Sequence, residues 1–467
     1  MKIIILGAGQ VGSSVAENLV SEANDITVVD TDPHLLQLMQ NRLDLRSVVG
    51  NAASPSVLRD AGAEDADLLI AVTQSDQTNL CACRIARTLF NLPTRIARLR
   101  SSDFVDHPEL LSLDNFAVDF SICPEQIVTD YIRQLIAFPE ALQVLDFADG
   151  VLSLIGVRAF EGGPLVGHPL KALRYHMPNI EVRVSAIYRD GEPIIPEGDT
   201  FIKPGDEVFC LAASANIRRV MRELTHVDRP MRRIMIAGGG NIGLRLARAI
   251  EKDYEVKVLE YDKRRAEAIA IELNDTLVLR GDSTDENLLE NENIDEMDMF
   301  VALTNDEEDN IMSASLAKRM GARRTLALIN RKSYVDLVQG GHIDIAISPA
   351  QTSIGSLLAH VRRGDVVAVH SLRRGAAEAL EIIAHGDEKN SKVVGRSIED
   401  IRLPRGATIG AVVRLEGATE DSPGRPAVLM AHHDTVIEPE DHLIVFCTSK
   451  KLVRQVEKLF QVDFSFF

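Results

Sequence analysis

Two glycine-rich segments carry the clearest chemical signal in this chain. Each follows a short apolar run and precedes a helical pattern. In such a strand–turn–helix unit the glycines let the backbone approach a pyrophosphate, and the helix N-terminus favours its negative charge. The segments are Gly7-Ala8-Gly9-Gln10-Val11-Gly12 and Gly238-Gly239-Gly240-Asn241-Ile242-Gly243. They predict two nucleotide sites, although a structural turn that has lost its ligand would keep the same glycines.

An acidic residue closes the next predicted strand in both copies. Asp30 follows the run 26–29, and Glu260 follows the run 256–259. A carboxylate here accepts hydrogen bonds from ribose hydroxyls, whereas a 2′-phosphate would be repelled by roughly a few kcal/mol. The first site, with Asp30, is therefore predicted to favour NAD or an adenosine nucleotide over NADP, and Glu260 matches Asp30 in the second copy.

Further polar residues follow the third and fourth predicted strands of each copy. Asn51, Thr73 and Gln74 in the first copy match Asp282, Thr304 and Asn305 in the second. Because the carboxyl ends of parallel strands meet at one edge of a sheet, we expect each set to gather beside its glycine loop.

The elements that position these residues alternate between strand and helix. This alternation predicts an α/β fold with parallel sheets. We expect two Rossmann-like, doubly wound parallel-sheet domains, at residues 1–125 and 231–350. Each is followed by a small α+β domain with short β-rich pieces, at residues 140–225 and 366–459.

Shorter features complete this organisation. Helices at 125–138 and 351–362 are predicted to join each large domain to its small domain. Asp190-Gly191 predicts a hairpin turn. The segment 416–426, rich in Gly, Pro, Ser and Asp, predicts a long mobile loop.

Composition excludes several classes of partner. The 467 residues carry a formal net charge of −18, which argues against contacts with nucleic acid or anionic lipid. No apolar run approaches a membrane span, and no secretory signal is present. The five cysteines fit packed free thiols in a reducing compartment. We therefore expect a cytoplasmic protein that reaches a membrane only through a partner.

No catalytic constellation is evident beside either glycine loop. A dehydrogenase needs a proton donor or acceptor near the hydride, and we therefore expect no enzyme. The alternative is a duplicated-Rossmann NAD-dependent oxidoreductase. His432-His433-Asp434 is interpreted as a surface turn rather than a metal site. Met297, Met299 and Met312 are interpreted as core residues.

The tandem layout resembles the regulator-of-potassium-conductance (RCK) family, specifically the nucleotide-binding subunits of bacterial Trk potassium uptake systems. The resemblance rests on the two glycine loops and on a small domain after each, with Gly198-Asp199-Thr200 in the first and His433-Asp434-Thr435 in the second. It implies a homo-oligomeric, tetrameric ring at the cytoplasmic face of the inner membrane. It also implies that the ring binds NAD(H) and ATP or ADP and gates an integral-membrane potassium transporter. A nucleotide sensor for another partner protein is the remaining alternative.

The resemblance adds Arg98 to the first set of nucleotide contacts, because its guanidinium could reach a phosphate. The matching strand, 325–331, has no arginine at that position, and Asp306 to Asp309 add acidic residues beside the second crevice. We therefore expect unequal sites, with the more highly charged nucleotide in the first.

Overall fold

The structure is a computed structural model that describes residues 1–20, 24–225, 230–331, 334, 338, 343–361, 366–372, 377–416 and 425–462. It forms two compact units. The first combines Met1–Asp130 with Arg233–Leu357, and the second combines Tyr131–Arg232 with Leu358–Phe467. Within the described ranges, none of the helices has the length and apolar character needed to span a bilayer.

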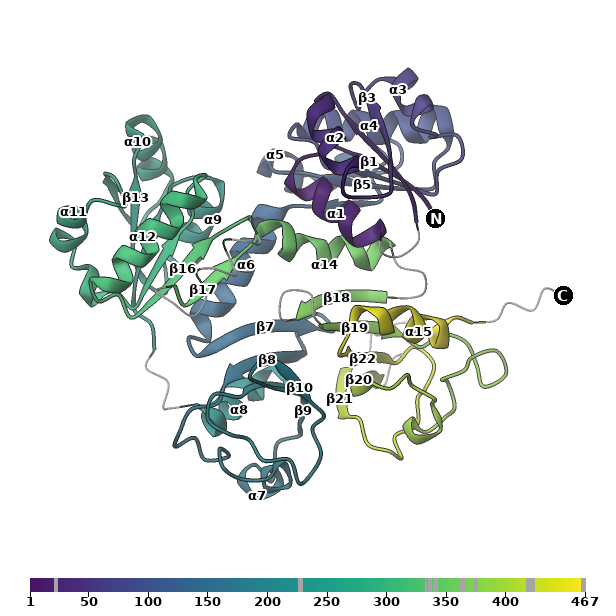
Figure 1. Ribbon diagram of the computed structural model, residues 1–467, viewed down its shortest axis with the longest axis vertical. Helices are drawn as coiled ribbons and strands as arrows, with labels where there is room; N and C mark the ends of the chain where they lie inside the picture. The colour runs from purple at the N-terminus through teal and green to yellow at the C-terminus, as the bar shows by residue number, and fades with distance from the viewer. Residues whose placement is uncertain are drawn as a thin grey trace. The chain divides into compact units, whose positions relative to one another are not determined.

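The first unit contains two parallel sheets of the same topology (Figure 1). The first sheet has the order β3-β2-β1-β4-β5-β6. Its strands are β1 (Lys2–Leu6), β2 (Asp25–Asp30), β3 (Arg46–Val49), β4 (Leu68–Ala71), β5 (Thr94–Arg98) and β6 (Phe120–Ile122). The connecting helices are α1 (Gln10–Val20), α2 (Pro33–Gln40), α3 (Pro55–Asp60), α4 (Asp76–Phe90) and α5 (Ser102–Val105).

The second sheet repeats this order as β14-β13-β12-β15-β16-β17. Its strands are β12 (Arg233–Ala237), β13 (Glu255–Glu260), β14 (Leu277–Arg280), β15 (Met299–Ala302), β16 (Arg324–Leu328) and β17 (Ile345–Ile347). The helices are α9 (Asn241–Ile250), α10 (Lys263–Glu272), α11 (Glu286–Asn291) and α12 (Glu307–Arg319). The predicted pair of Rossmann-like domains is confirmed.

The apolar strands form because both faces of each sheet are covered. All four residues of β4 are buried, as are the last four of β1. Ile4 and Leu6 pack in a core with Leu80 and Ala86 of α4, and by alternation Ile3 and Ile5 face the opposite side of the sheet. Burial on both faces explains why these strands are continuously apolar rather than alternating.

The second unit contains two antiparallel sheets, one from each small domain, confirming the predicted α+β modules. The first has the order β10-β9-β11-β8-β7 and the second β18-β19-β22-β20-β21. The strands of the first are β7 (Ala141–Phe147), β8 (Leu152–Arg158), β9 (Val182–Arg189), β10 (Glu192–Ile194) and β11 (Glu207–Ala213). Those of the second are β18 (Val366–Leu372), β19 (Ala377–Ile383), β20 (Ala407–Glu416), β21 (Arg425–Met430) and β22 (His442–Cys447). The helices are α7 (Leu173–His176) and α8 (Ile217–Leu224) in the first, and α15 (Lys450–Phe460) in the second.

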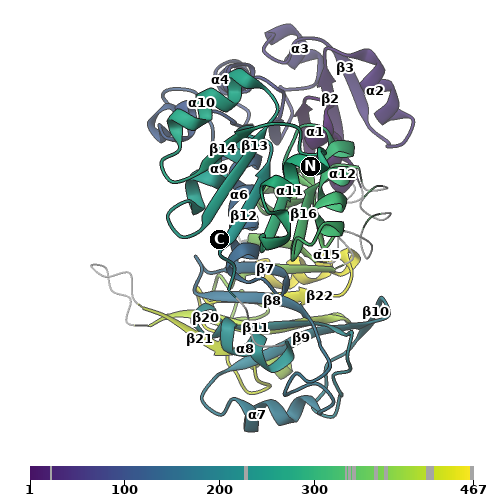
Figure 2. The ribbon, with the colours of Figure 1, turned by 90° about the vertical axis from the view of Figure 1, so that its left-hand side faces the viewer.

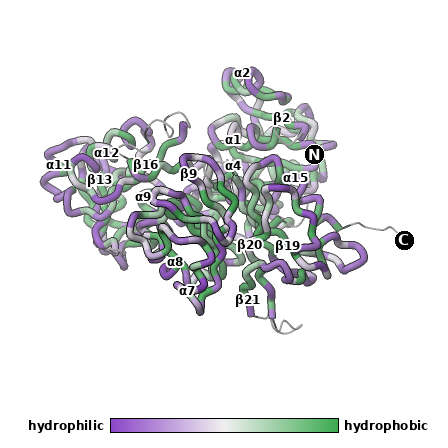
Figure 3. The backbone as a smooth tube through the Cα atoms, turned by 60° about the horizontal axis from the view of Figure 1, so that its bottom comes forward, coloured by the Kyte–Doolittle hydropathy of each residue, from purple (hydrophilic) through white to green (hydrophobic). Residues whose placement is uncertain are grey.

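The two small sheets share an apolar core. Phe147, Phe209 and Leu211 of the first pack with Ala411 and Phe446 of the second. The first sheet buries its other face under α8, through Ile217, Val220 and Leu224. In Figure 2, β7 and β8 of the first sheet lie beside β22 of the second, and in Figure 3 hydrophobic chain runs along β19 and β20. The small domains therefore form a single two-sheet unit.

The joining helices and the hairpin lie where the sequence predicts them. Helix α6 spans Pro124–Ala137 and α14 spans Pro349–Val361. Strands β9 and β10 are joined through Asp190 and Gly191, whose φ angles are +50° and +89°. Of the predicted loop 416–426, residues 417–424 lie outside the described part of the chain, whereas its ends belong to β20 and β21.

One core assignment is wrong. Met297 and Met299 are buried, but Met312 is 63% exposed. It lies on α12, whose buried positions are instead occupied by Asn310, Ser313 and Ala314. A helix that covers one sheet face exposes its opposite side, and periodicity alone did not show on which side Met312 lies.

Candidate nucleotide-binding site

Both glycine loops have the same geometry. Gly7 and Gly238 adopt φ angles of +108° and +102°, a region that L side chains rarely adopt. A Cβ on Gly12 would lie 1.9 Å from the carbonyl oxygen of Gly7, and one on Gly243 would lie 1.9 Å from that of Gly238. The third glycine is therefore required for the helix to approach the loop, and both copies keep the complete turn.

Each of the two acidic residues accepts a hydrogen bond from the backbone of its glycine loop. The Ala8 N–H donates to Asp30 Oδ2 at 2.6 Å, and the Gly239 N–H donates to Glu260 Oε2 at 2.7 Å. The other carboxylate oxygen accepts from the backbone two residues downstream in both copies, at 2.9 Å. The predicted acids thus shape the loops in this ligand-free geometry and keep acceptor lone pairs for ribose hydroxyls.

The threonine at the end of the fourth strand belongs to a network that recurs in both copies. Thr73 donates its backbone N–H and its hydroxyl to Asn79 Oδ1, at 3.0 and 2.7 Å. Asn79 Nδ2 donates to the carbonyl of Arg98 at 2.9 Å. Thr304, Asn310 and Leu328 repeat these contacts, at 2.8, 2.8 and 3.0 Å. A buried asparagine therefore ties two strand ends together at each crevice.

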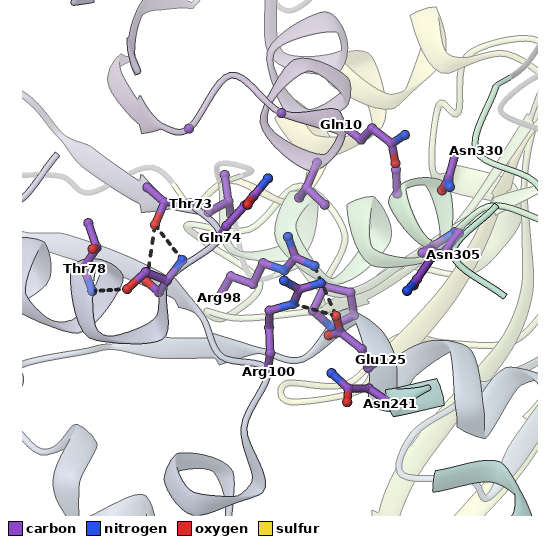
Figure 4. Close-up of a pocket in the computed structure, with 18 of the residues that line it drawn as sticks. Gln10, Thr73, Gln74, Thr78, Arg98, Arg100, Glu125, Asn241, Asn305 and Asn330 are labelled. Atoms are coloured by element: carbon purple, nitrogen blue, oxygen red, sulfur yellow. Dashed lines mark hydrogen bonds and ion pairs between the residues drawn. The ribbon is translucent and has the colours of Figure 1, made fainter. Parts of the chain in front are cut away.

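A cavity of about 1200 Å³ collects residues of both copies within the first unit. Its lining includes these predicted residues: Gly7, Gly9, Gln10, Val11, Asp30, Asn51, Thr73, Gln74, Arg98, Gly240, Asn241, Ile242, Thr304 and Asn305. The remaining predicted residues, Ala8, Gly12, Gly238, Gly239, Gly243, Glu260 and Asp282, are not part of the lining. Figure 4 shows the amides of Gln10, Gln74, Asn241, Asn305 and Asn330 around the cavity.

Two arginines and a glutamate meet in the first crevice (Figure 4). Glu125 Oε1 lies 3.2 Å from Arg98 Nη2 and 2.9 Å from Arg100 Nε. Burial alone would raise the pKa of Glu125, but the hydrogen bond from Arg100 and the charge of Arg98 hold it below its ordinary value. Burial lowers the pKa of Arg98. Arg98 Nε is buried and makes no hydrogen bond to the described residues, so one donor of this guanidinium is unsatisfied in the ligand-free geometry.

The second crevice lacks this group. By strand position, Leu328, Asn330 and Ala350 replace Arg98, Arg100 and Glu125. Acids gather here instead: burial, followed by the charges of Asp306, Asp282 and Glu308, raises the pKa of Asp309. The two crevices therefore share a backbone but differ in charge.

Two arginines near the glycine loops also differ between the copies. Arg265 Nε donates to the Gly239 carbonyl at 2.8 Å, where the first copy has Leu35. Arg245, on the helix after the second glycine loop, donates to Gln126 Oε1 at 3.1 Å and to the Arg100 carbonyl at 3.0 Å. The second large domain thus supports the backbone beside the first domain's arginines.

The sequence reasoning missed Arg100, Glu125 and Arg245 as site residues. Arg100 lies two residues after Arg98, and Glu125 follows the Cys123-Pro124 pair that comes directly after the sixth strand, so strand-end position was an available signal for both. Arg245 had no such signal, because its contact joins two domains. The described residues contain no cluster of three or more His, Cys, Asp or Glu side chains suited to a metal ion.

The family model of the TrkA-N domain matches residues 3–117 and 234–349, the two large domains. The model of the TrkA-C domain matches residues 154–225 and 387–461. The Trk system potassium uptake protein TrkA of Halomonas elongata is 56% identical over 467 residues, covering 100% of both chains. The chain belongs to the TrkA family.

Other TrkA proteins show the same full-length similarity. The protein of Vibrio alginolyticus is 56% identical over 462 residues, covering 99% of both chains, and that of Haemophilus influenzae is 49% identical with the same coverage. Among solved structures, the GsuK RCK domain has a TM-score of 0.62 at 18% identity, covering 98% of this chain and 94% of that one. The GsuK channel bound to NAD has a TM-score of 0.60 at 17% identity, covering 98% and 78%. The predicted RCK fold is confirmed.

Proposed function

We propose that this TrkA family member is a nucleotide-sensing, non-enzymatic regulatory subunit that gates an integral-membrane potassium transporter from the cytoplasmic face of the inner membrane. The observation that carries the proposal is the cavity in the first unit, lined by two glycine loops, Asp30 and the Arg98–Glu125–Arg100 group. The TrkA relatives are described as parts of potassium uptake systems, which supports the partner. A tetrameric ring of this chain is the assembly that we infer.

NAD(H) and ATP or ADP are the proposed ligands. The GsuK channel, which shares the fold, has been solved with NAD bound. In the first crevice, helix α1 begins at Gln10 and would direct its free N–H groups at a pyrophosphate. Asp30 would accept from the adenosine ribose, and the arginines would contact the outermost phosphate.

The proposed ligands are distributed unequally. Arg98 and Arg100 supply cations for a third phosphate in the first crevice, whereas the second has Leu328 and Asn330 at those positions. A triphosphate in the second crevice would face acids without this compensation. We therefore assign ATP or ADP to the first crevice with higher affinity than to the second.

The proposed conformational signal begins at Glu125. This residue lies in the first turn of α6, which continues from the first unit into the second. A phosphate that pairs with Arg98 and Arg100 competes with the Glu125 carboxylate, so nucleotide charge acts on the start of the joining helix. Moving a ring between closed and open states needs about 5 kcal/mol of differential binding in total, which several sites can share at roughly 1–3 kcal/mol each.

Potassium flux in vesicles tests the proposal. The transporter is reconstituted with and without this protein, and flux is measured with ATP, ADP, NAD and NADH. We expect flux to depend on both the protein and the nucleotide, and the Arg98→Ala variant to weaken the ATP response. Unchanged flux under every condition would overturn the regulatory function. Turnover of NADH with candidate substrates, measured in parallel, would instead establish an oxidoreductase.

A further inference from the structure

Within the second unit, the second small domain contacts residues 146–148 of the first, where Asp146 and Phe147 end β7 and Ala148 begins the turn that follows. We call these three residues the 146–148 turn. His370 Nε2, on β18, lies 3.1 Å from the Asp146 carbonyl oxygen. Its ring meets Phe147 edge-on, with the centroids 4.8 Å apart. The neighbouring Gln143 Nε2 donates to the Ser371 carbonyl at 2.9 Å. Contacts to both backbone and side chain thus tie the 146–148 turn to β18.

A buried carboxylate also accepts a hydrogen bond from this turn. Glu381, on β19, is 2% exposed. Its Oε2 accepts the Ala148 N–H at 3.0 Å, and its Oε1 lies 2.6 Å from His442 Nδ1. Ala148 has a φ of +49°, a strained conformation for a side-chain-bearing residue. The turn therefore depends on a buried anion whose counter-charge is a histidine.

Among its described residues, the first small domain has no equivalent cluster. By strand register, Gly156 takes the place of Glu381, Glu207 that of His442, and Leu145 that of His370. At Gly156, a Cβ would lie 2.7 Å from the Phe209 ring, which fills the space. At the described positions the His–Glu–His arrangement thus distinguishes the second small domain from the first, and it is not a requirement of the shared fold.

The two histidines titrate in opposite directions. The hydrogen bond to Glu381 raises the pKa of His442, and the charges of Glu381, Asp149 and Glu440 act in the same direction. Burial lowers the pKa of His370, which the Asp146 carbonyl and the charges of Glu381 and Asp146 offset only in part. Glu440 is itself paired with His385, at 2.5 Å.

The direction in which each histidine changes the stability of the fold with pH follows from the linkage between protonation and folding. The stability that His442 contributes is fully present below its pKa in the unfolded chain, near 6.5. It is lost as pH rises through the raised pKa of the folded state. The stability that His370 contributes is fully present above its pKa in the unfolded chain. It is lost as pH falls through the lowered pKa of the folded state. Both contributions are present together only in the interval between the two folded pKa values, which contains the ordinary histidine value near 6.5.

We propose that His370, Glu381 and His442 form a pH-window latch, which holds the 146–148 turn near neutral pH and loosens it on both the acid and the alkaline side. Acid charges His370 where its ring packs edge-on against Phe147. Alkali removes the counter-charge of Glu381 and leaves a buried carboxylate. The latch makes the pairing of the two small domains sensitive to pH, independently of nucleotide.

Hydrogen exchange of the full chain tests the latch. The C2–H exchange of single histidines, followed by mass spectrometry across about pH 5 to 9, should give a midpoint above the ordinary value for His442 and below it for His370. Amide exchange of the peptide containing Ala148, corrected for intrinsic rates, should be slowest near neutral pH and at least severalfold faster at both extremes. Equal midpoints for the two histidines, or protection that changes in only one direction with pH, would overturn the proposal.

The exchange profile of the Ala148 peptide has an acid arm and an alkaline arm, which are the two pH ranges where exchange becomes faster. Two variants separate these arms. Glu381→Gln should remove the alkaline arm, and His370→Phe should remove the acid arm while keeping a ring beside Phe147. His433→Asn, in an exposed turn, is the matched control and should leave both arms unchanged. Retention of both arms in both latch variants would contradict the assignment even if the wild-type profile has a maximum.

Discussion

The two nucleotide crevices share a backbone but not a charge distribution. The glycine turns, the acid-to-loop hydrogen bonds and the threonine–asparagine networks match almost atom for atom. The first crevice adds two arginines balanced by Glu125, whereas the second places an alanine, a leucine and an asparagine there. The comparison shows that the fold fixes where a nucleotide lies, while a few side chains decide how much phosphate charge it can carry.

Both small domains contain the same arginine–aspartate ion pair, and its removal is the prediction with the largest expected effect. In each, an arginine forms a two-pronged pair with a 1% exposed aspartate: Arg189 with Asp206, and Arg414 with Asp441, with both contacts at 2.8 Å. Asp206→Asn and Asp441→Asn should each lower the free energy of unfolding by about 2–3 kcal/mol, because a partly exposed arginine loses two charge-assisted hydrogen bonds to a buried carboxylate. Urea unfolding measures this loss, and a small effect in one copy alone would show that the domains are not energetically equivalent.

The same pair predicts a pH dependence. Burial raises the pKa of Asp206, but the hydrogen bond from Arg189 and that from the Lys203 N–H lower it below its ordinary value overall. A depressed carboxyl pKa stabilises the fold above the unfolded value and loses this contribution as pH falls through the folded value. We expect the wild-type protein to lose stability in acid more steeply than Asp206→Asn, as measured by thermal unfolding between about pH 3 and 6.

Replacing Arg98 tests the difference between the crevices. Arg98→Ala should weaken ATP binding by about 1.5–3 kcal/mol, roughly 10- to 150-fold, because a charge-assisted contact to phosphate is lost. Glu260→Ala, in the second crevice, should have a much smaller effect on ATP. Isothermal titration measures both, and equal losses of ATP affinity would refute the inequality.

Removing the competing carboxylate of Glu125 should change ATP affinity in the opposite direction from removing Arg98. Glu125→Gln keeps the shape of the side chain but frees the positive charge of Arg98 and Arg100 for phosphate. We expect ATP affinity to rise by up to about tenfold, and NAD affinity to change less, because NAD carries no third phosphate. Ala350→Glu provides the matched change in the second crevice, where Leu328 and Asn330 occupy the positions of Arg98 and Arg100. A fall in ATP affinity for Glu125→Gln would show that the carboxylate assists binding instead of competing.

The smallest expected effect concerns the shared network. Thr73→Val and Thr304→Val each remove one hydroxyl that donates to a buried asparagine. Both should lower the free energy of unfolding by about 1 kcal/mol, and by nearly the same amount. Denaturant titration of the two variants checks this, with Ser315→Ala on the opposite side of α12 as a control.

Much of the fold followed from periodic patterns. The repeated order of apolar runs, glycines and acids predicted both parallel sheets, because backbone geometry at a phosphate-binding turn admits few other residues. The hairpin at Asp190-Gly191 followed from the positive φ angles that such a turn requires. Met312 shows the limit: an apolar residue in a helix was assigned to the core, although it lies on the exposed side.

The site was predicted less completely, for a physical reason. Asp30, Thr73 and Arg98 stand at strand ends, and strand ends meet wherever strands are parallel. Arg245 approaches from another domain, 145 residues from the Arg100 carbonyl that it contacts. Local pattern contains no information about such a long-range contact.

The amino-acid sequence by itself determined the repeat, the parallel sheets, the glycine turns and the imbalance of cations between the crevices, because these depend on local backbone requirements and on residue identity. Only the tertiary structure decided that Glu125 neutralises Arg98 and Arg100, that both glycine loops line one cavity, and that His370 and Glu381 hold a turn of the other small domain. Those features require side chains far apart in the chain to meet in low-dielectric surroundings, where their charges and hydrogen bonds act on one another.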